Sequence, residues 1–279
     1  MTAIEYPYAH LDRGTCAPPT LSEGKVYLIP RGLMGQQNDR KAISLDLATG
    51  AVREYSIDLV SIDAIGVNSD YAFVTNDLNG VGHVGRIDIE TGDTLAVDLG
   101  SAAGQLICDD SKVCVFWIEF GRGEPDRTYL SGFNEDLSVA STADLAASGI
   151  EVPMLPTALT NGRIYFVSYH QPKSEHDDAR FTIAFYSAEN NSVGHFAAPG
   201  QGAKDYEVSH LLPLDVGLLV FGYMPGIDGK PGTGLVELLD YESGELIDSF
   251  AVDYVPSQCV IWGDWLFVLG ATPADMLLV

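Results

Sequence analysis

Short hydrophobic runs recur along the chain and alternate with glycine-rich or acidic turn sequences. The first core residues of six such runs, at intervals of 42 to 54 residues, are Val26, Tyr71, Val113, Ile164, Leu218 and Trp265. Apolar runs of this length between turn sequences are typical of β-strands. A period of about 40 to 50 residues is that of propeller blades. The pattern therefore predicts an all-β fold, a six-bladed β-propeller of four-stranded antiparallel blades.

A recurring turn sequence supports this repeat. Asp46 to Gly50, Asp88 to Gly92 and Asp240 to Gly244 share an acid, a hydroxyl residue three positions later and then a glycine. The acid can accept hydrogen bonds from turn amides, and glycine supplies the positive φ that reverses the strand. Ser187 to Asn191 uses asparagine instead, and Asn134 to Leu137 is a shorter version. Separate hairpins of a β-sandwich are the alternative, which the regular spacing disfavours.

The second of the six repeats resembles a repeat known from other proteins. Tyr71 to Asn76 carries an aromatic–apolar–Val-Thr-Asn strand, and Ile87 to Gly92 carries an apolar–Asp-x-x-Thr-Gly hairpin. Together they resemble the YVTN-type repeat of the quinoprotein-like, WD40-like β-propeller superfamily, over most of the chain. This resemblance implies the fold only, since such folds host enzymes, binding modules and scaffolds.

The sixth repeat is short. Its apolar strand covers Trp265 to Gly270, and only a few residues follow. We expect Met276 to Val279 to form its third strand and Ile4 to Tyr8, from the other end of the chain, its fourth, because this pairing removes two exposed sheet edges. No linker sequence divides the chain, so residues 1–279 are predicted to form a single domain.

The chain is strongly acidic. It has 39 Asp and Glu against 15 Lys and Arg, a formal net charge of −24. Nucleic acid and anionic membrane surfaces are therefore disfavoured as partners. No apolar run reaches 18 residues, so no membrane insertion is expected. Met1 to His10 lacks a basic segment before an apolar core, so we expect no secretory signal in the chain as given, although Met1 is also compatible with a start that replaces a removed leader.

Four cysteines bear on the compartment. Cys108 and Cys114 flank a turn between two predicted antiparallel strands, and Cys16 and Cys259 precede the apolar strands of the first and last blades. Both pairs are candidate disulfides. Two disulfides favour an extracytoplasmic location, in the periplasm or at the cell surface, over the cytoplasm. Buried thiols acting as small apolar residues are the alternative.

Loop lengths indicate where a site lies. The acidic turns are short, whereas the opposite ends of the blades are predicted to carry the longer loops Arg31 to Arg40, Asp77 to His83, Phe120 to Arg127, His170 to Arg180 and Met224 to Thr233. Binding groups gather on long loops of a rigid scaffold, so we expect the site there, at the mouth of the central channel. The candidate ligand-binding residues are Arg31, Asn76, Asp77, Glu119, His170, Tyr223 and, at the start of an innermost strand, Glu207.

The sequence does not select one function. The favoured interpretation is a non-enzymatic propeller that binds a protein, a peptide or a small polar ligand. A metal-dependent hydrolase of the lactonase type with a divalent cation is the first alternative, and a scaffold domain of a larger surface assembly is the second. His170 to Asp178 has side chains of metal-ligand type, but its charge favours a solvated loop. No nucleophile-elbow or His-Glu-x-x-His sequence occurs.

Overall fold

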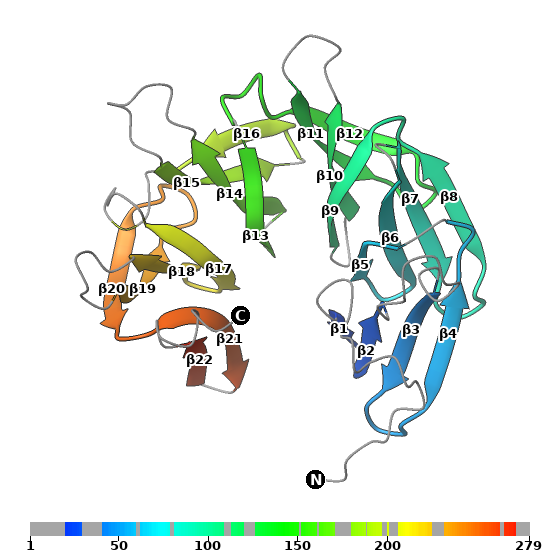
Figure 1. The fold of residues 1–279 in the computed structure, drawn as a ribbon, viewed down its shortest axis with the longest axis horizontal. Helices are drawn as coiled ribbons and strands as arrows, with labels where there is room; N and C mark the ends of the chain where they lie inside the picture. Colours follow the sequence, from blue (N-terminus) through cyan, green and yellow to red (C-terminus); the bar gives the residue numbers. More distant parts are fainter. Residues whose placement is uncertain are drawn as a thin grey trace. The chain divides into compact units, whose positions relative to one another are not determined.

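We describe the fold from a computed structural model. The described residues are 20–29, 41–59, 62–78, 81–108, 113–119, 126–150, 152–160, 162–170, 180–187, 189–196, 200, 206–224, 232–262 and 265–271. The chain forms two compact units, Met1–Asp144 and Leu145–Val279. Within the described ranges every helix or strand element is a β-strand (Figure 1). No helix of this part of the chain is long and apolar enough to cross a membrane.

The described part of the first unit holds three four-stranded antiparallel sheets, each with its strands in chain order. The first sheet contains β1 (Thr20–Ser22), β2 (Lys25–Leu28), β3 (Lys41–Asp46) and β4 (Val52–Ser56). The second contains β5 (Ala64–Val67), β6 (Tyr71–Leu78), β7 (Val81–Asp88) and β8 (Thr94–Asp98). The third contains β9 (Ala102–Cys108), β10 (Val113–Glu119), β11 (Arg127–Phe133) and β12 (Val139–Asp144).

Two further four-stranded sheets and one two-stranded sheet make up the described part of the second unit. The fourth sheet contains β13 (Val152–Thr160), β14 (Arg163–His170), β15 (Arg180–Ser187) and β16 (Ser192–His195). The fifth contains β17 (Glu207–Leu214), β18 (Gly217–Met224), β19 (Thr233–Leu239) and β20 (Leu246–Val252). The sixth contains β21 (Val255–Trp262) and β22 (Trp265–Ala271).

The predicted all-β pattern of four-stranded antiparallel blades is thus confirmed for five sheets of the described chain, with two strands of a sixth. The expected closing strands, Ile4 to Tyr8 and Met276 to Val279, lie outside the described residues. Closure therefore stays a prediction, and so does a single domain over residues 1–279.

The acidic turns work as the sequence predicts. Each joins the third and fourth strands of its sheet, and the carboxylate of its first residue accepts backbone N–H groups. Asp46 accepts from Ala48 and Thr49 at 3.0 and 2.8 Å, and Asp240 does the same in its own turn. Gly50, like Gly92 and Gly244, has a φ of 70° to 84°. Asn191 takes this backbone conformation in the asparagine version, with a φ of 50°.

We expect these turn carboxylates to make the stability of the fold decline at acidic pH. Backbone N–H groups, foremost those of Thr49, Thr91 and Ser243, hold the pKa of Asp46, Asp88 and Asp240 below the ordinary value. A lowered folded-state pKa stabilises the protein above the unfolded pKa of about 4, and this contribution is lost as pH falls through the folded pKa. We therefore expect Asp88→Asn to lower the melting temperature at pH 7 and to flatten its decline below about pH 4. An unchanged melting profile across this range would contradict the assignment.

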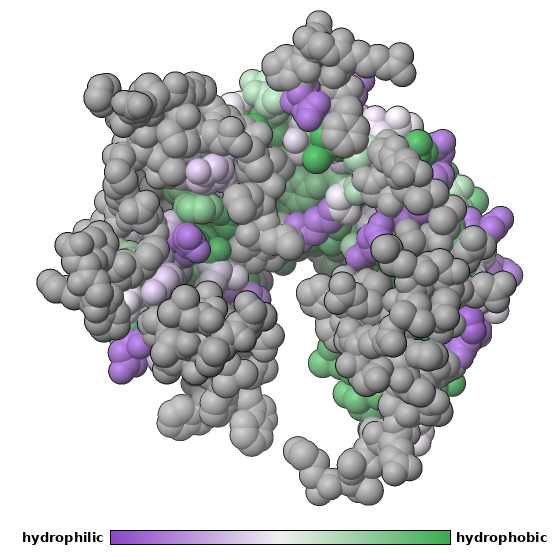
Figure 2. All heavy atoms as spheres, viewed as in Figure 1, coloured by the Kyte–Doolittle hydropathy of each residue, from purple (hydrophilic) through white to green (hydrophobic). Residues whose placement is uncertain are grey.

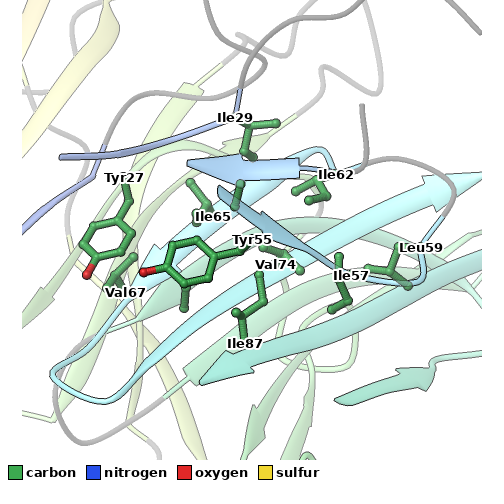
Figure 3. Packing of buried hydrophobic residues seen from close by; sticks show 12 residues of the cluster. Tyr27, Ile29, Tyr55, Ile57, Leu59, Ile62, Ile65, Val67, Val74 and Ile87 are labelled. Carbon is green, nitrogen blue, oxygen red and sulfur yellow. The ribbon is translucent and has the colours of Figure 1, made fainter. Parts of the chain in front are cut away.

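In the first unit, adjacent sheets pack through β6, the second strand of its sheet, which is buried on both faces. Val74 of β6 and Ile87 of β7 pack in one core with Tyr55 and Ile57 of the first sheet (Figure 3). Phe73, its neighbour on β6, joins a core with Val115 of the third sheet. Because side chains alternate along a strand, each second strand must be apolar on both faces. This requirement explains the continuous hydrophobic runs of the sequence.

Arginine side chains of three sheets donate hydrogen bonds to the turn of a neighbouring sheet. Arg53 on β4 donates from Nη1 to the Ile89 carbonyl oxygen at 2.6 Å and from Nη2 to that of Glu90 at 2.9 Å. Arg86 donates to the carbonyl oxygen of Glu135 at 2.6 Å. Arg163 reaches the turn that contains Tyr241 in the same way, at 3.1 Å. The acidic turns are therefore docking points between sheets as well as chain reversals.

Three expectations about local structure need correction. Asp77 to His83 is not a long loop, because β6 continues to Leu78 and β7 starts at Val81, with Asp77 paired to Gly82. The continuous apolar sequence from Val113 to Ile118 predicts a strand buried on both faces along its whole length. In the structure β10 is buried from Val113 to Phe116, whereas Trp117 and Ile118 are only half-buried.

The third correction concerns the predicted Cys108–Cys114 disulfide, which is wrong. The register pairs Cys114 with Ile107 and Cys108 with Val113. Adjacent residues of a strand point to opposite faces, so the two thiols face away from each other, and no disulfide joins them. Cys16 lies outside the described residues, as does the side chain of Cys259, so the second pair stays a prediction.

Candidate functional site

The predicted site residues lie at one end of their sheets. We call this the loop end, where the second strand of a sheet passes to the third, and the opposite end, with the acidic turns, the turn end. In the first unit, Asn76 and Asp77 lie near the end of β6, and Glu119 is the last residue of β10. In the second unit, His170 ends β14 and Tyr223 lies one residue before the end of β18. Arg31 and the side chains of Asp77 and His170 lie outside the described residues.

Asn76 is buried, with 1% of its surface exposed. Its Oδ1 lies 2.9 Å from Nδ1 of His83, its partner across the strands. Its Nδ2 has no hydrogen-bond partner among the described residues. A buried amide nitrogen normally has a partner, so Asn76 presents an unused donor near the loop end of the second sheet.

Two predicted residues of the second unit are brought together. Glu207, the first residue of β17, is paired with Tyr223 of β18. Glu207 is exposed and Tyr223 is half-buried, with its phenol packed over Gly232. A carboxylate and a phenol therefore stand side by side at the loop end of the fifth sheet.

A set of stacked and hydrogen-bonded side chains surrounds Glu119 at the loop end of the third sheet. Trp117 and Tyr129 are paired across β10 and β11, and their rings stack with centroids 4.3 Å apart and planes inclined by 18°. Both residues are half-buried. We call these two stacked rings the aromatic platform.

Hydrogen bonds fix both rings. The Trp117 indole donates from Nε1 to Ser131 Oγ at 2.9 Å, and Ser131 Oγ lies 2.8 Å from Thr142 Oγ1. The Tyr129 hydroxyl donates to Glu119 Oε2 at 3.1 Å. Because the polar atom of each ring has a partner within the sheet, these hydrogen bonds hold both rings in one orientation.

Charged groups surround the platform. Glu119 is paired with Arg127 and Tyr129 with Asp144, and Arg127 Nη1 lies 3.9 Å from Asp144 Oδ2. Burial raises the pKa of the Tyr129 phenol; Arg127 acts in the opposite direction, and the carboxylates of Glu119 and Asp144 raise it further. The platform thus lies between two carboxylates and one guanidinium.

The sequence analysis proposed Glu119 as a candidate residue but did not propose Trp117 or Tyr129. The hydrophobic run ending at Ile118 suggests complete burial, which hides Trp117 as one more core residue. Two signals point to it: a tryptophan near the end of its strand, and an acid two positions later that faces the same side. Tyr129 lies in a part of β11 without strong hydrophobic alternation, so only the register with β10 places it against Trp117.

A cavity of about 460 Å³ lies at the turn end of the first two sheets. Its lining residues are Glu23, Lys25, Arg53, Ser69, Asp70, Tyr71, Asp88, Ile89 and Glu90. The guanidinium of Arg53 is already bonded to the carbonyl oxygens of Ile89 and Glu90, and the Asp88 carboxylate accepts the Thr91 N–H. These groups already hydrogen-bond within and between the two sheets, so we assign the cavity a structural role rather than a binding role.

No metal centre is apparent in the described ranges. Within them, no group of three or more His, Cys, Asp or Glu side chains is arranged to hold a metal ion. The predicted cluster His170 to Asp178 lies outside the described residues, except for the backbone of His170.

Comparison with known proteins supports the fold class. No protein-family model matches the chain, and no curated protein matches it. Among solved structures, it is similar to the β-propeller domain of the trilobed protease from Pyrococcus furiosus, with a TM-score of 0.57 and 11% identity over 90% of this chain and 75% of that one. The acylaminoacyl peptidase of Pyrococcus horikoshii gives 0.58 and 10% identity over 90% and 42%.

An oligogalacturonate lyase in complex with manganese is also similar, with a TM-score of 0.54 and 16% identity over 82% of this chain and 62% of that one. The chain therefore spans less than two thirds of the lyase and of the acylaminoacyl peptidase. At these identities the similarity establishes a β-propeller-like fold, and activity has to be argued from the site.

Proposed function

We propose that this protein is a non-enzymatic binding protein that holds a partner protein, peptide or small polar ligand at the loop end of its sheets. The principal contact is the aromatic platform of Trp117 and Tyr129. The observation that supports this most is the orientation of its rings, which are half-buried and fixed by hydrogen bonds to Ser131 and Glu119.

The platform has the physical properties of a binding contact. Trp and Tyr, together with Arg, are the residues most enriched among those that dominate binding energy, because they bring a large contact area at a small entropy cost. Here the rings already have one orientation, which reduces the cost of ordering them in a complex. Arg127 and the carboxylates of Glu119 and Asp144 supply a polar rim.

The test follows the Trp117 indole resonance in a proton–nitrogen NMR spectrum, assigned from its loss in Trp117→Phe. We expect at least one of three probes to shift it: a blocked lysine–glycine octapeptide, its glutamate–glycine counterpart, or a neutral hexasaccharide. Trp117→Ala should weaken binding of that probe by about tenfold or more, as expected of a dominant contact residue. If no probe shifts the resonance, the proposed site is wrong.

We also propose that six blades form one domain of the YVTN, WD40-like superfamily, with Ile4 to Tyr8 and Met276 to Val279 completing the last blade. The incomplete sheet β21–β22 motivates this proposal, because two strands alone are marginally stable. Deleting residues 1–8 should lower the melting temperature by more than about 5 °C. An unchanged melting temperature would refute this closure.

A further inference from the structure

Two carboxylates lie beside the aromatic platform. Glu119 follows Trp117 by two residues on β10 and faces the same side, and Asp144 is the register partner of Tyr129 on β12. Arg127 is the one cation of this group; it is the register partner of Glu119, and its Nη1 lies 3.9 Å from the Asp144 carboxylate. Glu119, bonded to the Tyr129 hydroxyl, is exposed. A cation that approaches from the Glu119 side thus meets a carboxylate next to an aromatic stack.

One side of the platform faces small residues. The register partner of Trp117 on the innermost strand is Ala103, which is half-buried. The backbone of Gly82, at the loop end of the second sheet, packs against Ala103. Neither residue carries a long side chain, so the face of Trp117 that points away from Tyr129 is not covered by a large group at these positions.

The chain already places guanidinium groups over aromatic rings. Arg53 lies 5.0 Å from the ring centroid of Tyr55, Arg86 lies 4.5 Å from that of Tyr71, and Arg163 lies 4.9 Å from that of Phe185. In the described part of the chain no such cation lies over Trp117. Since indole is the aromatic ring that attracts cations most strongly, this ring is suited to a cation supplied by a ligand.

We infer that the platform recognises a lysine or arginine side chain of a partner protein or peptide; this inference rests on the proposed function. The ammonium or guanidinium group lies over the outer face of Trp117 and contacts Glu119, and its aliphatic stem packs along the ring. The formal net charge of −24 of the whole chain attracts a basic partner from a distance. On the face drawn in Figure 2, hydrophilic side chains of the described residues lie at several separate places. A neutral sugar also stacks on aromatic rings, but it gains nothing from this charge.

The experiment titrates the full chain with the same three probes at 150 mM salt, where distant charges are screened. We expect the lysine–glycine octapeptide to shift the Trp117 indole resonance, and the glutamate–glycine peptide to leave it unchanged. Affinity, measured for every variant by isothermal titration calorimetry because the indole resonance is lost with Trp117, should weaken about tenfold in Trp117→Ala and at least threefold in Glu119→Gln. Trp117→Phe, which keeps a ring, should lose less than Trp117→Ala.

Matched controls separate this site from general attraction to an acidic protein. Glu189→Gln and Glu245→Gln remove exposed carboxylates of the second unit and should leave affinity for the lysine peptide within twofold. Equal losses in these controls and in Glu119→Gln, or binding that survives Trp117→Ala, would overturn the inference. A shift caused by the hexasaccharide or the glutamate peptide but not by the lysine peptide would overturn the inference and leave the proposed function standing. No shift with any probe would overturn both.

Discussion

Phe73→Ala is expected to destabilise the first unit by about 3–5 kcal/mol, the range for removing a buried phenylalanine ring. Phe73 has none of its surface exposed and lies in the core that joins the second and third sheets. Its ring also meets that of Tyr71 edge to face, with centroids 6.0 Å apart. The alanine variant leaves a cavity between two sheets that cannot close without moving a strand. Urea-induced unfolding followed by circular dichroism measures the loss.

Phe73→Leu is the matched control, because it keeps most of the volume and the apolar character. We expect it to lose less than about 1.5 kcal/mol. A loss below about 1 kcal/mol for Phe73→Ala would contradict the packing of these two sheets through β6.

Glu237→Ala should have an effect of similar size in the second unit, about 3–4 kcal/mol, because it leaves two buried donors without an acceptor. Glu237 on β19 is 2% exposed. Its Oε2 accepts the Gly200 N–H at 2.7 Å and the Tyr206 hydroxyl at 3.1 Å. The Tyr206 ring packs over Gly222, so the phenol cannot turn to water without losing this contact. The carboxylate therefore fixes residues that connect the fourth sheet to the fifth.

Glu237→Gln is the control for this second variant, since its amide oxygen can still accept both hydrogen bonds. We expect it to lose about 1 kcal/mol, close to the usual worth of one hydrogen bond. Equal losses for the alanine and glutamine variants would show that the carboxylate acts through its charge rather than as an acceptor. The same urea measurement distinguishes the two cases.

Local turn chemistry was the part of the fold that the sequence predicted best. The Asp–Thr–Gly pattern at Asp46 and Asp88 contains every group that its turn needs, so no distant residue decides its conformation. The hydrophobic period likewise predicted the second strand of each blade. The prediction of a long loop from Asp77 to His83 was wrong. The sequence Asn79-Gly80 is a typical signal for a two-residue hairpin, and β6 and β7 stay paired up to Leu78 and Val81.

For the candidate site residues, the sequence predicted only their positions along their strands. Asn76 and Glu119 lie at the expected ends of their strands, but their partners depend on the register across strands. The pairing of Trp117 with Tyr129 joins residues twelve positions apart, and nothing in either segment alone specifies it. Glu237 shows the same limit, because an acid in an apolar strand indicates a buried partner without identifying Tyr206.

The most direct test of the account is a crystal structure of the full chain with the blocked lysine–glycine octapeptide bound. We predict a lysine ammonium within about 6 Å of the Trp117 ring centroid, with Glu119 beside it. A peptide bound elsewhere on the protein, with the Trp117–Tyr129 platform left uncovered, would contradict the account.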